Sequence, residues 1–124
     1  SGAGKSVLVV DDEEWIRELT RALLEQDGYT VAAAASGEAA IDVLRRCAFD
    51  VVVTDWKMPG MNGLQLYEHL ATNDPNTAKR VLFMSGDLIN DAFTDFLRRH
   101  GRTCLPKPFA IEEFRTAVAG VLKA

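Results

Sequence analysis

The strongest constraint on the fold is a regular alternation between short apolar runs and longer segments of helical periodicity. The apolar runs lie at residues 6–10, 30–34, 51–54, 80–85 and 103–105. After each run, apolar residues recur at the three- and four-residue spacing of an amphipathic helix. Parallel strands need a crossover connection, so this alternation predicts a parallel sheet with helices on both faces. Right-handed crossovers would then give a doubly wound α/β sandwich.

Five helices are expected between and after these strands. We expect them over residues 14–27, 37–47, 64–72, 89–97 and 111–122. Gly28 is the expected C-cap of the first helix, and Ser36 the N-cap of the second. On the first helix, one face carries four residues that should enter the core: Ile16, Leu19, Ala22 and Leu23. Residues 73–76, N-D-P-N, should break the helix before them.

The length, charge and cysteine content exclude several classes of protein. The chain has 124 residues, enough for one domain, and a net charge of −4, which gives nucleic acid no electrostatic reason to bind. No apolar run approaches the roughly 20 residues that span a bilayer. Cys47 and Cys104 lie far apart and outside any C-x-x-C motif, which fits a reducing cytoplasm. Residues 1–5 are expected to be a tag or linker remnant, and residues 6–124 the domain.

Acidic, hydroxyl and amine side chains stand where the expected strands end. Asp11 and Asp12 follow the first strand, Asp55 follows the third, Ser85 ends the fourth and Lys107 follows the fifth. In open α/β sheets, ligands bind at this carboxyl edge. Carboxylates gathered in one place repel one another, and Mg²⁺ is a hard cation that carboxylate and phosphate oxygens suit. The sequence therefore predicts an Mg²⁺ site at this edge.

The same residues also suit phosphoryl transfer. A carboxylate beside Mg²⁺ can attack phosphorus, and Lys107 and Ser85 can bind the phosphoryl oxygens by charge and by hydrogen bond. Each feature alone has a structural interpretation, because an acidic pair complements a helix dipole and a lone Asp commonly forms a turn. The structural interpretations are less favoured when the five positions are considered jointly, because all five fall at the edge of the sheet where a site is expected.

Four segments in order resemble the receiver domain of two-component response regulators. They are V-L-V-V-D-D-E at 7–13, V-V-V-T-D-W-K-M-P-G-M-N-G at 51–63, V-L-F-M-S-G at 81–86 and L-P-K-P-F at 105–109. The similarity extends over residues 6–122, and D-x-x-M-P-G-M-x-G is specific on its own. It implies a flavodoxin-like (βα)5 sandwich whose five-stranded parallel sheet has the order 2-1-3-4-5.

The resemblance also implies a role for each site residue. The implied ligands of Mg²⁺ are Asp11, Asp12, Asp55 and the main-chain carbonyl of Lys57. Asp55 would be the phosphoacceptor, Ser85 would donate a hydrogen bond to the phosphoryl group, and Lys107 would pair with it. The peptide bond between Lys107 and Pro108 would be cis, which would aim the lysine.

The function implied is a cytoplasmic phosphoaccepting switch, not an enzyme, that promotes its own phosphorylation and dephosphorylation. The phosphodonor would be a histidine kinase or a phosphotransfer protein. Output would pass through the face made by the fourth helix, the fifth strand and the fifth helix. No nucleic acid or membrane contact is expected of this domain. The residues of the V-L-F-M-S-G and L-P-K-P-F motifs are most similar to those of receivers attached to hybrid sensor kinases. A stand-alone receiver and the receiver of a response regulator are the alternatives.

Two positions, Cys104 and Ala110, lack the residue that is usual in receivers. Many receivers carry Tyr or Phe where this chain has Cys104, so output would pass through the main chain, Phe83 or Phe93 instead. A buried small hydrophobe is the favoured interpretation of Cys104 over a redox group. Lys57 and Asp87 could form an exposed ion pair across the entrance, and a capping Asp or Ser is missing before the last helix.

Two other functions have to be weighed. A hydrolase of the haloacid dehalogenase type also uses an aspartyl nucleophile with Mg²⁺, but it would need a second Asp where Lys57 stands. A binding-only pseudo-receiver would usually lack the acceptor, the acidic pair or the lysine, and this chain has all of them. The S-G-A-G-K-S sequence at 1–6 resembles the end of a P-loop, but a strand rather than a helix should follow it.

Overall fold

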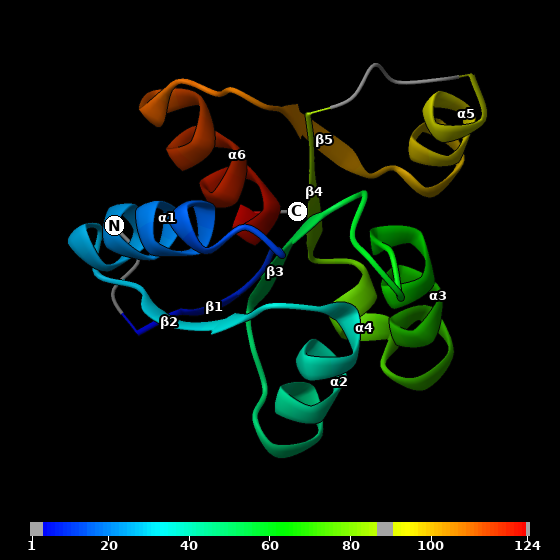
Figure 1. The fold of residues 1–124 in the computed structure, drawn as a ribbon, viewed down its shortest axis with the longest axis horizontal. Helices are drawn as coiled ribbons and strands as arrows, with labels where there is room; N and C mark the ends of the chain where they lie inside the picture. The colour runs from blue at the N-terminus through cyan, green and yellow to red at the C-terminus, as the bar shows by residue number, and fades with distance from the viewer. Residues whose placement is uncertain (1–3, 87–90, 124) are drawn as a thin grey trace.

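The computed structural model describes residues 4–86 and 91–123. Over these residues, strands and helices alternate along the chain, except that α3 and α4 follow each other directly (Figure 1). The strands are β1 Ser6–Val10, β2 Thr30–Ala34, β3 Val51–Asp55, β4 Val81–Ser85 and β5 Thr103–Pro106. The helices are α1 Glu14–Gln26, α2 Gly37–Arg46, α3 Gly63–Asn73, α4 Pro75–Ala78, α5 Asp91–His100 and α6 Ile111–Lys123.

The strands form one parallel sheet in the order β2-β1-β3-β4-β5, which confirms the predicted doubly wound fold. α1 and α6 pack on one face of the sheet, and α2, α3 and α5 pack on the other (Figure 1). Successive strand residues therefore enter different cores: Val7 and Val9 belong to one, and Leu8 and Val10 to the other. This double coverage explains why the central strands are continuously apolar.

On α1, the predicted inner face is only half right. Ile16 and Leu23 are buried, but Leu19 is 38% exposed and Ala22 also faces solvent. Thr20 is buried in their place, because its hydroxyl donates a 2.7 Å hydrogen bond to the main-chain oxygen of Ile16. A hydroxyl that is satisfied within its own helix can enter the core at little cost.

The predicted N-cap Ser36 of α2 is confirmed, whereas the C-cap of α1 is Asp27, one residue before the predicted Gly28. Ser36 accepts a hydrogen bond from the main-chain amide of Ala39, and Gly28 has a φ of 93° after α1.

The predicted break after α3 is present, but the chain then forms the single turn α4. Asp74 caps that turn, because its carboxylate accepts a hydrogen bond from the main-chain amide of Thr77 at 3.4 Å, and it also accepts one from the Thr77 hydroxyl at 2.6 Å. Pro75 lies in the first turn, a position that suits proline.

The fourth predicted helix corresponds to α5, whose described part begins at Asp91. Residues 89 and 90 of that prediction, and the predicted ion pair of Lys57 with Asp87, lie outside the described residues. The last helix, α6, starts at Ile111 without a capping side chain before it. Instead, the Glu113 carboxylate accepts a hydrogen bond from the main-chain amide of Ala110 at 3.0 Å.

Candidate functional site

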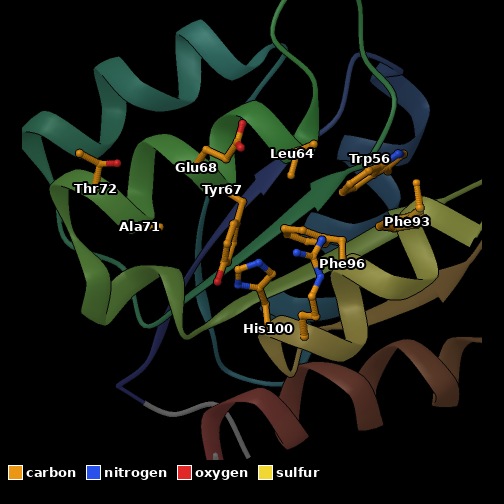
Figure 2. A pocket seen from close by; sticks show the side chains of 11 residues that line it. Trp56, Leu64, Tyr67, Glu68, Ala71, Thr72, Phe93, Phe96 and His100 are labelled. Carbon is orange, nitrogen blue, oxygen red and sulfur yellow. The ribbon is translucent and has the colours of Figure 1, made fainter.

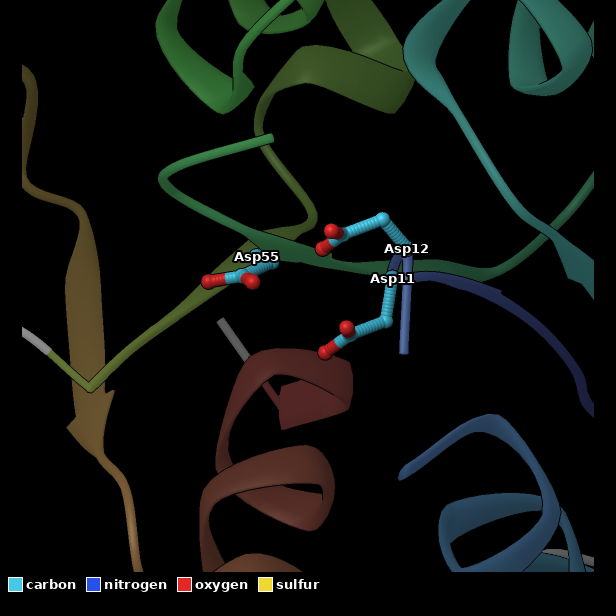
Figure 3. A group of neighbouring side chains, drawn as sticks. All are labelled: Asp11, Asp12 and Asp55. Carbon is cyan, nitrogen blue, oxygen red and sulfur yellow. The ribbon is translucent and has the colours of Figure 1, made fainter. Parts of the chain in front are cut away.

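Three aspartates meet at the carboxyl edge of the sheet (Figure 3). Asp55 is the last residue of β3, while Asp11 and Asp12 directly follow β1. Because β1 and β3 are parallel neighbours, both strands end on the same edge. One carboxylate oxygen of each aspartate lies within 4.8 Å of the others. Asp11 is fully buried and Asp55 is 6% exposed, whereas Asp12 faces solvent.

Lys107 brings a positive charge into this group. Its Nζ lies 2.8 Å from Asp11 Oδ2, 3.2 Å from Asp55 Oδ2 and 3.4 Å from Glu13 Oε1. The main-chain amide of Lys107 donates to the main-chain oxygen of Ser85 at 2.8 Å, which extends the β4–β5 pairing. The predicted cis peptide bond between Lys107 and Pro108 is confirmed.

The charges of these groups depend on each other. Burial raises the pKa of Asp55, and the charge of Asp11 raises it further, while Lys107 lowers it only in part. Burial alone would lower the pKa of Lys107, but its hydrogen bond to Asp11 and the charges of both aspartates raise it. Lys107 is therefore a fixed cation, and Asp55 is a carboxylate whose ionised form is destabilised.

The other two predicted residues lie at the rim of the same edge. Ser85 is the buried last residue of β4, the strand that pairs with β3. The main-chain amide of Lys57 donates a hydrogen bond to the Asp55 carboxylate, which partly offsets the effect of burial on the Asp55 pKa. The resemblance to receiver domains implies that the main-chain carbonyl of Lys57 is a ligand of Mg²⁺, and that role stays a prediction.

The loop after Asp55 folds back tightly against the acceptor strand. The main-chain amide of Gly63 donates to the Trp56 oxygen at 2.8 Å, and a Cβ on Gly63 would lie 2.5 Å from the Asp55 main-chain oxygen. Gly60 has a φ of 73°, a conformation that side chains disfavour. The glycines of the M-P-G-M-N-G segment thus permit the close turn beside the site.

Two contributors to the site were missed at the sequence level. Glu13 accepts from Lys107, and its main-chain amide donates to Asp11 Oδ1 at 2.9 Å. Arg17 donates to the main-chain oxygen of Asp11 at 2.8 Å. Glu13 stands in the D-D-E run and could have been found there, but Arg17 lies one helical turn further on, in a segment with no visible motif.

Cys104 is half-buried and packs against the core between the sheet and α5. Burial, reinforced by the negative charge of Asp55, raises its pKa to about 11. The thiol is therefore protonated at neutral pH, which supports its interpretation as a small hydrophobe.

Comparison with known proteins agrees with this geometry. Over residues 7–119 the sequence matches the profile of the response regulator receiver domain. The chain belongs to this family. Receiver domains are the phosphorylatable switches of two-component systems, and the aspartate group described above, which could hold a metal ion, lies within the matched residues.

Individual relatives show how widely this receiver domain is used. Sporulation initiation phosphotransferase F of Bacillus subtilis is 32% identical over 114 residues, which cover 92% of this chain and 90% of that protein. Sensor kinase CckA of Brucella abortus is 35% identical over 95% of this chain but only 12% of its own length. The chemotaxis protein CheY4 of Vibrio cholerae has a solved structure with a TM-score of 0.87, 27% identity and coverage of 97% of this chain and 100% of that one.

The matched receiver region thus makes up nearly all of one relative and a small part of another.

Among residues 4–86 and 91–123, no helix has the length and apolar character needed to cross a membrane.

Proposed function

We propose that this receiver domain is a phosphoaccepting switch of a two-component phosphorelay, in which Asp55 takes a phosphoryl group from a histidine kinase or a phosphotransfer protein in an Mg²⁺-dependent reaction. One observation supports the proposal above all others. Asp55, the end of a buried strand, lies within reach of both an acidic pair and the fixed cation Lys107. A nucleophile, ligands for a metal and a binding group for phosphoryl oxygens thus converge.

The donor set supports a hard divalent cation. The Lys107 ammonium contacts Asp11, Asp55 and Glu13, and Asp12 belongs to the same aspartate group, so these four carboxylates carry three negative charges beyond that one cation. All available donors are oxygens, which Mg²⁺ prefers. Asp11, Asp12, Asp55 and the Lys57 carbonyl would hold the ion. When bound, it would neutralise charge on the phosphoryl oxygens.

The residues of the chain would then act in defined roles. A carboxylate oxygen of Asp55 forms the new bond to phosphorus, while the bond from phosphorus to the donor nitrogen breaks and its electron pair leaves with the nitrogen. Lys107 exchanges its contact with Asp55 for one with a phosphoryl oxygen. The Ser85 hydroxyl donates a hydrogen bond to another, which draws the end of β4 towards the site.

A neighbouring apolar surface supports a protein as the phosphodonor. Trp15 is 62% exposed, and together with Leu19 and Phe109 it lines a cavity of about 400 Å³ beside Lys107. Large exposed apolar side chains next to a polar site are typical of protein-binding surfaces. A donor seated here would present its phosphoryl group directly to the acidic edge.

Output is proposed to pass through the face made by α5, β5 and α6. Trp56, the residue after Asp55, stacks on Phe93 of α5 with ring centroids 3.6 Å apart. Any displacement of the Asp55 main chain would therefore press on α5 directly.

The two free cysteines are compatible with the cytoplasm as the compartment. We further propose that the domain accelerates its own phosphorylation and dephosphorylation without other catalytic activity.

Incubation with acetyl phosphate and Mg²⁺, followed by intact mass spectrometry, tests the proposal. The expected result is the gain of one phosphoryl group per chain, which is lost with EDTA and in Asp55→Asn. Equal phosphorylation of the Asp55→Asn variant would refute the assignment of the acceptor.

A further inference from the structure

A cavity of about 620 Å³ opens between α3 and α5, on the face of the sheet opposite α1 and α6 (Figure 2). Five of its lining residues carry aromatic or imidazole rings: Trp56, Tyr67, Phe93, Phe96 and His100. Pockets of 300 to 1,000 Å³ with a largely aromatic lining and a few polar groups are typical of small-molecule sites. Neither the acidic site nor the surface proposed for the phosphodonor includes this cavity.

The rings that line the cavity hold one another in place. Trp56 stacks on Phe93 at 3.6 Å, and Phe96 lies 4.6 Å from the ring of His100. Tyr67 meets His100 edge to face at 5.5 Å. Aromatic rings prefer partners that stack with an offset or meet them edge to face. A pre-formed slot of this kind suits a planar ring better than a flexible aliphatic chain.

The polar groups of the cavity favour an anion. Arg99 lines the cavity in the basic last turn of α5, and among the described residues it has no hydrogen bond or ion pair. The adjacent Arg98 does not line the cavity, and it pairs with Asp95 at 3.5 Å. Among the described residues of the lining, Glu68 is the one acidic residue, and it turns its carboxylate away from the rings (Figure 2).

We propose that this cavity binds a small planar aromatic anion, with its ring among the aromatic side chains and its acidic group on Arg99. The site does not depend on phosphorylation of Asp55. It is nevertheless adjacent to it, because Trp56 both lines the cavity and follows Asp55 in the chain. A ligand that fixes Trp56 would bias the same contact with α5 that phosphorylation is proposed to use.

Three probes that share one ring system test the assignment: 2-naphthoate, 2-naphthylmethanol and 2-naphthylmethylammonium, which are negative, neutral and positive. Binding is followed by the indole N–H signals of ¹⁵N-labelled protein. The chain has two tryptophans, and Trp15→Phe assigns the two signals. Trp15 lines the cavity beside Lys107, so its signal reports binding of a probe at that second place.

The expected result is a saturable shift of the Trp56 signal, with naphthoate bound about three- to fivefold more tightly than the alcohol, as for an exposed ion pair. Arg99→Gln should remove that preference, and the matched control Arg98→Gln should retain it. Ala71→Trp should block the cavity, whereas Ala22→Trp on the exposed side of α1 should not.

Several results would overturn the proposal. Equal or tighter binding of the alcohol or the ammonium compound would exclude an anion site. A shift confined to Trp15, or equal effects of the two arginine substitutions, would place the ligand elsewhere. A protein that failed to accept phosphate but bound naphthoate at Trp56 would refute the proposed function and leave this site intact.

Discussion

The acidic site and the aromatic cluster share the peptide bond between Asp55 and Trp56, but they are stabilised in opposite ways. In the acidic site, buried carboxylates lie close together, and the positive charge of Lys107 offsets them only in part. We define the aromatic cluster as Trp56, Tyr67, Phe83, Phe93, Phe96 and His100. Its rings come from the loop after β3, from β4, from α3 and from α5, and they pack against one another. The acidic site should therefore lower the free energy of unfolding, and the aromatic cluster should raise it.

This difference indicates how the domain can work as a switch. Groups that destabilise each other in the resting protein gain most from a bound cation or a transferred phosphoryl group. A packed cluster responds to a shift at its edge by rearranging as a unit, because dense cores do not deform continuously.

Phe83→Ala should be the most damaging change. Phe83 is fully buried and meets Trp56, Phe93 and Phe96 within 6.2 Å. Removal of its ring should lower the free energy of unfolding by about 3–5 kcal/mol, as measured by urea denaturation. Phe109→Ala, at a half-buried ring outside the cluster, is the matched control and should cost much less. Equal losses would show that the cluster has no special stabilising role.

Lys107→Met should have the next largest effect. The change leaves Asp11 and Asp55 without their cation and should lower stability by about 1–3 kcal/mol in EDTA. Mg²⁺ should restore part of the loss, because the metal replaces the missing positive charge. Arg45→Met breaks only an exposed pair with Asp42 and should cost about 0–0.5 kcal/mol whether or not Mg²⁺ is present. A loss at Lys107 that Mg²⁺ leaves unchanged would argue against a cation site.

Asp55→Asn should stabilise the metal-free protein. Burial raises the pKa of Asp55, so its ionised form is less favourable in the folded than in the unfolded chain. Such a group favours folding below its unfolded pKa, and this contribution is lost as the pH rises through the folded pKa. The variant should therefore have a higher free energy of unfolding than the parent protein at pH 7, as measured by urea denaturation in EDTA. The gain should shrink towards pH 4, and a variant less stable than the parent at pH 7 would contradict this account of the acidic site.

The smallest predicted effect concerns the two thiols. With a pKa of about 11, Cys104 should stay protonated at pH 8 and react slowly with Ellman's reagent. Cys47 is exposed and should react first. A Cys47→Ser variant should then show one slow thiol that becomes fast in urea, whereas rapid reaction in the folded state would disprove the shielding of Cys104.

The acidic site was largely predictable from the sequence, and the aromatic cluster was not. Strands of a parallel sheet end at one edge, so Asp11, Asp55 and Lys107 could be brought together from their positions after apolar runs alone. The ring contacts of Trp56 and Phe96 depend instead on how α3 and α5 pack across the sheet, which no local pattern encodes. Similarly, the spacing on α1 favoured Leu19 over Thr20, because a hydroxyl satisfied within its helix is invisible in a hydrophobic pattern.

The most direct test of the central claim is to locate the phosphoryl group chemically. The protein is treated with acetyl phosphate and Mg²⁺, reduced with borohydride, which converts an aspartyl phosphate to homoserine, and digested for peptide mass spectrometry. We predict homoserine at position 55 alone, and none when EDTA replaces Mg²⁺. Homoserine at position 11 or 12, or at position 55 independently of Mg²⁺, would contradict the account.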